Sequence, residues 1–122
     1  MSPLQPEEIR LLTEVGFLAG ARGDIKHATA IFDALQACRP NAGFAYVGMA
    51  MAHLNRRQYD DALRRLDDGL KRAEEADAAD LHAIRALVLH LAGRASECDR
   101  AIQAAGNHLL ARALATQGAL AA

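Results

Sequence analysis

Aromatic residues are scarce in this sequence. It contains no tryptophan, three phenylalanines and two tyrosines in 122 residues, although 52% of the chain is apolar. The apolar content is mostly alanine and leucine, whereas β-sheets draw on aromatic and β-branched side chains. This balance argues against a β-sandwich, and we expect an all-α fold whose length suits one domain with a real core.

An excess of charge of either sign is also lacking. Fourteen basic and fifteen acidic residues leave a formal net charge of −1, which argues against nucleic acid as a partner. No apolar run reaches the roughly 18 residues that a membrane-spanning helix needs. The first ten residues, MSPLQPEEIR, do not place an apolar stretch after a basic one, as a secretory leader does. We therefore expect a cytoplasmic protein without membrane insertion.

Metal-ligand patterns are missing as well. The only cysteines are Cys38 and Cys98, and both fall in helical patterns, so we expect buried thiols in a reducing compartment rather than a disulfide. His82 and His90 stand eight residues apart, too far for the adjacent-turn pairing that metal sites on one helix use. The sequence predicts no metal site and no cofactor.

Motifs that would indicate catalysis are equally absent. The chain has no glycine-rich phosphate loop, no nucleophile turn and no distinctive Cys/His or Ser/His arrangement. Carboxylate pairs such as Asp60-Asp61 and Asp67-Asp68 stand beside arginines on one charged helix, where ion pairs between neighbouring turns are the ordinary explanation. We expect a protein that is not an enzyme.

The sequence does contain a series of apolar patterns at helical spacing. They predict seven helices joined by very short turns: 6–21, a second that ends at Pro40, 41–55, one within 56–76, and three more around 81–91, 98–105 and 109–114. Pro6 suits the first turn of a helix because the amide it lacks would be unpaired there. Residues 41–55 are apolar on nearly every side, so we expect that helix to be central or covered by a partner.

Small residues recur at a fixed period along these helices. Ala28 and Ala62 are 34 residues apart, each shortly after a tight turn, and Cys98 follows 36 residues later. The period predicts one domain, 1–122, of three stacked antiparallel helix pairs, about 7–40, 41–76 and 77–106, with residues 107–120 as a capping helix. Only small side chains let helices approach closely. We expect such crossings at Gly16, Ala50 and Ala86.

The first of these units resembles the tetratricopeptide-repeat family. Val15 and Gly16 in its first helix, then Ala28, Phe32 and the closing Pro40, occupy positions of that family's pattern. The other two units match less well and lack the proline. The resemblance implies a TPR-like α-solenoid. In size and in its Ala/Leu-rich units, the chain is most similar to the small tetratricopeptide chaperones of bacterial type III secretion.

In a tetratricopeptide stack, the first helix of each pair lines a concave face that binds other proteins. Carried over from Gly16, this face is mainly apolar in the present chain. The resemblance implies partner binding by Phe17, Phe44, Val47, Met51, Leu54, Ile84 and Leu87. The alternative is that these residues pack on one another, or on the C-terminal helix, as core.

The resemblance implies a chaperone or assembly factor that holds a helical, aggregation-prone protein partner. That partner would be an export substrate, such as a type III secretion needle or translocator subunit, or a co-chaperone, bound through an amphipathic helix. A structural scaffold is the alternative, in which the same apolar face is buried in a homodimer and there is no separate client.

Overall fold

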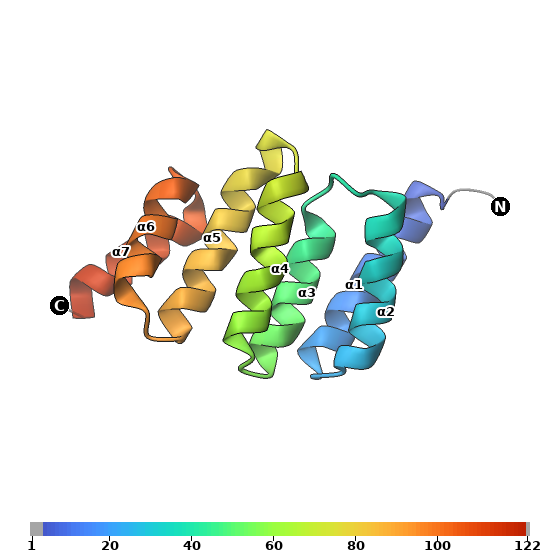
Figure 1. Cartoon of the computed structure of the whole chain (residues 1–122), viewed down its shortest axis with the longest axis horizontal. Helices are drawn as coiled ribbons and strands as arrows, with labels where there is room; N and C mark the ends of the chain where they lie inside the picture. Colours follow the sequence, from blue (N-terminus) through green and yellow to red (C-terminus); the bar gives the residue numbers. More distant parts are fainter. Residues whose placement is uncertain (1–3, 122) are drawn as a thin grey trace.

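The computed structural model describes residues 4–121, with side-chain surroundings for residues 4–117. This part of the chain forms seven α-helices and no strand (Figure 1). They are α1 (Pro6–Ala21), α2 (Ile25–Cys38), α3 (Phe44–Asn55), α4 (Tyr59–Arg72), α5 (Glu75–Leu91), α6 (Ala95–Ala105) and α7 (Leu109–Ala121). The prediction of an all-α fold is confirmed.

The helices stack in chain order as antiparallel pairs. α1 packs on α2, α3 on α4 and α5 on α6, while α7 contacts both α5 and α6 at the end of the row (Figure 1). Contacts of both α1 and α2 with α3, of both α3 and α4 with α5, and of α5 with α7 join the pairs into one stack. This arrangement agrees with the predicted stack of three pairs and a terminal helix.

Local chemistry sets most of the helix boundaries. Pro6 begins α1 as predicted, and the Asp24 carboxylate accepts the backbone N–H of His27 to cap α2. Gly23 and Gly93 turn the chain between paired helices with φ angles of 73° and 77°, a region that favours glycine. The third helix begins at Phe44, three residues later than predicted, because residues 40–43 make the connecting turn.

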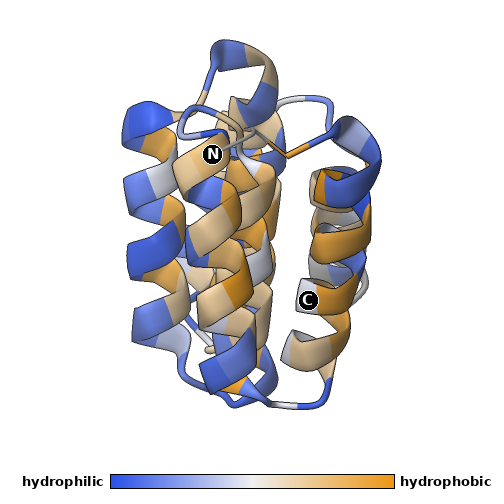
Figure 2. Cartoon of the chain, turned by 90° about the vertical axis from the view of Figure 1, so that its right-hand side faces the viewer, coloured by the Kyte–Doolittle hydropathy of each residue, from blue (hydrophilic) through white to orange (hydrophobic). Residues whose placement is uncertain are grey.

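The core runs along the stack between the helices. In Figure 2, hydrophilic residues gather at the outer edges of the molecule and in the turns, and hydrophobic ones toward the interior. Ala50 and Ala86 are fully buried, as expected for helix crossings. A Cβ on Gly16 would lie 2.9 Å from ring carbons of Phe32, so the predicted close approach at Gly16 is confirmed as well.

Two packing predictions are wrong. Cys38 is exposed, because it is the last residue of α2 and lies beyond the buried stripe of that helix; Cys98 is buried as expected. Val15, whose position in the repeat pattern packs within the unit, is 44% exposed, whereas Gly16 and Gly20 of α1 face the neighbouring helices. The repeat pattern therefore placed Gly16 correctly on the packing face of α1 but was wrong at Val15.

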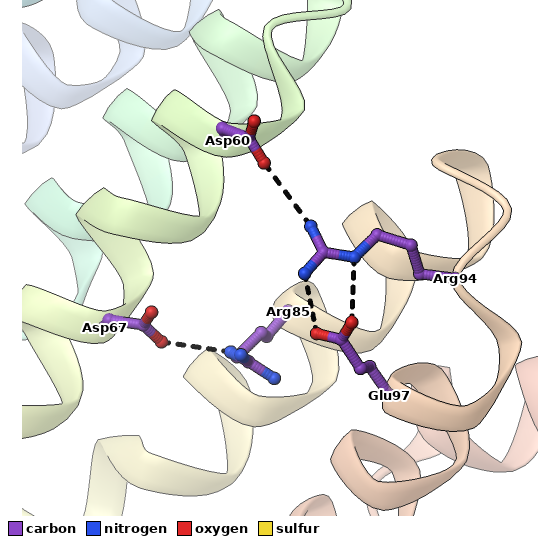
Figure 3. A network of polar contacts seen from close by, with 5 residues as sticks. All are labelled: Asp60, Asp67, Arg85, Arg94 and Glu97. Atoms are coloured by element: carbon purple, nitrogen blue, oxygen red, sulfur yellow. Dashed lines mark hydrogen bonds and ion pairs between the residues drawn. The ribbon is translucent and has the colours of Figure 1, made fainter.

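A network of ion pairs ties α4 to α5 and α6 (Figure 3). The Arg85 Nε donates to Asp67 Oδ1 at 3.0 Å, and Arg94 lies 3.4 Å from Asp60 and 2.8 Å from Glu97. Asp60 and Asp67 of α4 thus pair outside their own helix, whereas Asp61 pairs along it with Arg64 at 3.1 Å. Because partly exposed pairs contribute about 0–1 kcal/mol each, the network orients α5 and α6 more than it stabilises them.

Candidate functional site

A pocket of about 330 Å³ opens between α1, α3 and α5. It lies near the first turns of α3 and α5 and is bounded by the turn that precedes α7. Most of its lining is apolar, with two carboxylates and a histidine. The lining residues of this α1–α3–α5 pocket are Phe17, Gly43, Phe44, Val47, Asp77, Asp80, Leu81, Ile84 and His108.

The aromatic wall of the pocket is held by a ring beneath it. Phe17 meets the fully buried Phe32 edge to face, with ring centroids 5.2 Å apart. Phe32 fits between the helices because the facing positions are glycines: a Cβ on Gly48 would lie 2.1 Å from its Cζ. The small residues of α1 and α3 therefore fix Phe32, and through it Phe17, at the pocket.

The polar rim of the pocket is fixed by hydrogen bonds. Asp77 accepts the backbone N–H of Gly43 at 3.0 Å, which ties the start of α5 to the start of α3. The Nδ1 of His108 accepts the Leu110 N–H, so the Nε2–H of the neutral ring donates to Asp80 at 2.7 Å. Two ordered carboxylates thus stand beside an apolar surface, an arrangement that complements a cationic group.

The seven residues predicted for partner binding fall into three groups. Met51 and Leu87 are half-buried and pack against the core. Leu54 is 8% exposed within that core, because α3 is covered on nearly all sides, and its side chain offers a partner little surface. The other four line the pocket: Phe17, Phe44, Val47 and Ile84.

Asp77 and His108 escape prediction from the sequence. Asp77 bonds to Gly43 and His108 to Asp80, residues 34 and 28 positions apart in the sequence, and helical periodicity alone does not predict such contacts. His108 directly precedes α7, and its side chain accepts the Leu110 N–H. A histidine directly before an apolar helix was the available signal, because such positions satisfy unpaired amides.

The surroundings of His82 and Cys98, which lie outside the pocket, shift their pKa values. Burial, and then the nearby Arg85 charge, lower the pKa of His82. Burial raises the pKa of the Cys98 thiol, which donates to the Ala86 carbonyl. Among the described residues, no three His, Cys, Asp or Glu side chains gather as a metal site requires. In the same part of the chain, no helix combines the length and apolar character needed to cross a bilayer.

The fold and pocket define an all-α stack of helices with an apolar pocket between α1, α3 and α5. No protein-family model matches the sequence, and no curated protein is significantly similar to it. The fold is similar to a chain of a solved structure described as the CopN-Scc3 complex, with a TM-score of 0.66. The two chains are 15% identical, and the match covers 93% of this chain and 68% of the other. At this identity the likeness concerns the fold alone.

Proposed function

We propose that this protein is a chaperone or assembly factor that holds an apolar segment of a partner protein at the α1–α3–α5 pocket. The observation that supports the proposal most is the convergence of Phe17, Phe44, Val47 and Ile84, from three helices, around an open volume of about 330 Å³. Recognition sites are typically concave and mostly apolar, with a few placed polar groups.

The lining of the pocket suggests what the partner segment presents. An amphipathic helix offers apolar side chains at three- and four-residue spacing, and the pocket has room for a large one. Burying a leucine or phenylalanine side chain contributes about 1.5–3 kcal/mol before ordering costs are subtracted. The carboxylates of Asp77 and Asp80 favour a lysine or arginine next to that anchor.

The fold comparison supports a client from a secretion system. Scc3 is a type III secretion chaperone, and the similar structure is its complex with CopN. Together with the tetratricopeptide-like pattern of residues 7–40, this favours a cytoplasmic chaperone. We propose that its client is a type III secretion export substrate, such as a needle or translocator subunit, kept from aggregating until export.

The test is a pair of pocket variants measured against a matched control. Val47→Phe fills part of the pocket without adding a charge, and Ile84→Asp places a carboxylate in it. Leu91→Asp introduces the same charge on the same helix at a residue that is 52% exposed outside the pocket. The partner is first identified by mass spectrometry of co-purifying proteins from the native host and then titrated by calorimetry.

We expect both pocket variants to weaken partner binding at least about tenfold, which corresponds to about 1.4 kcal/mol. Leu91→Asp should bind as the unaltered protein does, and circular dichroism should show all three variants folded. Unchanged affinity of Val47→Phe would contradict the proposal. If the chain instead only self-associates and Val47→Phe makes it monomeric, the scaffold alternative holds.

A further inference from the structure

A second apolar surface lies on α1, away from the pocket. Leu11, Val15 and Leu18 are 61%, 44% and 53% exposed. Their spacing of four and then three residues places them on one face of the helix, which we call the α1 stripe. Of the five large apolar side chains that are exposed in the described part of the chain, these three are neighbours, whereas Leu91 and Leu109 stand on different helices.

The position of the α1 stripe makes its exposure unusual. Helix α1 is the first in the row, and a stack of repeats normally presents a polar outer face at its ends. The inner side of α1 is occupied: a Cβ on Gly16 would meet Phe32, and one on Gly20 would lie 3.2 Å from Ala52. The stripe therefore faces away from the rest of the chain, and contiguous apolar surface of this kind marks an interaction site.

The charges around the α1 stripe indicate what covers it. Glu7 stands four residues before Leu11, and Arg22 stands four residues after Leu18. In a two-fold antiparallel pairing centred between Glu14 and Val15, Leu11 of one copy lies opposite Leu18 of the second copy. Glu7 then lies opposite Arg22 of that copy. In this register leucine faces leucine and Glu7 faces Arg22, while Val15, next to the axis, faces Glu14 of the second copy.

We infer that two copies of this chain associate through α1, antiparallel about a two-fold axis, with the α1 stripe at the centre of the interface. Each contact is then made twice, which is the geometry of the commonest protein dimers. Phe17 points to the pocket from another side of α1, since successive helical residues are about 100° apart. The dimer therefore leaves both pockets open, unlike the scaffold in which the pocket face is buried.

The first test is the mass of the chain in solution. Sedimentation equilibrium over a concentration series should approach twice the chain mass of 13.1 kDa. The variant Leu11→Glu with Leu18→Glu should stay at the single-chain mass throughout. Leu109→Glu is the control, because Leu109 is 78% exposed on α7, and it should dimerise like the unaltered chain. Circular dichroism establishes that each variant is helical.

Three results would overturn the inference. They are a single-chain mass of the unaltered chain at every concentration, dimerisation of the double variant, and an equal loss of the dimer in Leu109→Glu. Val47→Phe, which alters the pocket, should leave the mass unchanged, so failure of the proposed function and failure of the dimer are seen separately.

Charge exchange tests the antiparallel pairing itself. Glu7→Arg alone or Arg22→Glu alone should raise the dimer dissociation constant several-fold, because each places like charges opposite one another twice. The two changes together should restore the original value, and added salt should reduce the difference between single and double variants. A double variant that dimerises no better than either single variant would rule out this pairing.

Discussion

Substituting alanine for Gly48 should destabilise the protein, although alanine is the better helix former. Gly48 lies inside α3, where Gly→Ala ordinarily gains about 1 kcal/mol. Here the added Cβ would lie 2.1 Å from Cζ and 2.2 Å from Cε1 of Phe32, far inside van der Waals contact. The ring is fully buried against Phe17, so it has no free space to enter.

The expected size follows from these two opposing effects. Overpacking a well-filled core costs about 1–3 kcal/mol, and a Cβ only 2.1 Å from a carbon of a buried ring belongs in the upper half of that range. After the gain in helix propensity, the free energy of unfolding should fall by about 1–2 kcal/mol. For a chain of this length, that lowers Tm by roughly 3–8 °C.

Urea denaturation followed by circular dichroism measures this loss, and Phe32→Leu supplies the control. Phe32→Leu alone should destabilise, because it leaves a cavity. In that background the Gly48→Ala cost should shrink or change sign, since the overlapping ring is gone. A Gly48→Ala protein at least as stable as the original would refute the packing of Phe32 over Gly48, and with it the support proposed for Phe17.

Three further predictions concern single groups. A thiol reagent should label Cys38 in the folded protein and Cys98 only on unfolding, and equal labelling of both before unfolding would contradict the burial of Cys98. The pKa of His82 is lowered in the folded protein, so as pH falls the unfolded chain binds a proton there at a higher pH than the folded chain does. The stability contributed by neutral His82 is therefore complete above about pH 6.5 and is lost as pH falls toward the folded pKa. His82→Gln should therefore flatten the fall of the urea midpoint between about pH 7 and 5, and an unchanged slope would count against it. Arg85→Gln should cost no more than about 1 kcal/mol in the same assay, since Asp67 is 48% exposed, and a loss of several kcal/mol would show that the pair is more than orienting.

The helices were predictable because residues at or next to their ends determine where they begin and end. Pro6 fixes the start of α1, Gly23 and Gly93 turn the chain, and the alanine period sets the pairing. The start of α3 was the exception. Nothing in residues 41–43 themselves argues against a helix. The Gly43 N–H donates to Asp77 of α5, which is 34 residues away in the sequence, so a local pattern could not predict this contact.

The candidate site was predictable only in part. The tetratricopeptide resemblance selected Phe17, Phe44, Val47 and Ile84, which do line one pocket. The resemblance could not separate them from Leu54, because whether a position on α3 meets solvent or core depends on how closely other helices cover it. The exposed face of α1 was missed for the same reason: Val15 fits the repeat pattern, but glycines on the opposite side of α1 decide which face packs.

The central claim is that the α1–α3–α5 pocket binds a partner protein, and site-specific photo-crosslinking in the native host tests it most directly. A photoreactive residue at Val47 should yield one dominant adduct with another protein, and Ile84→Asp should abolish it. The same residue at Leu109, which is 78% exposed on α7, should not capture that protein. Adducts of equal yield from both positions, or none from Val47, would contradict the account.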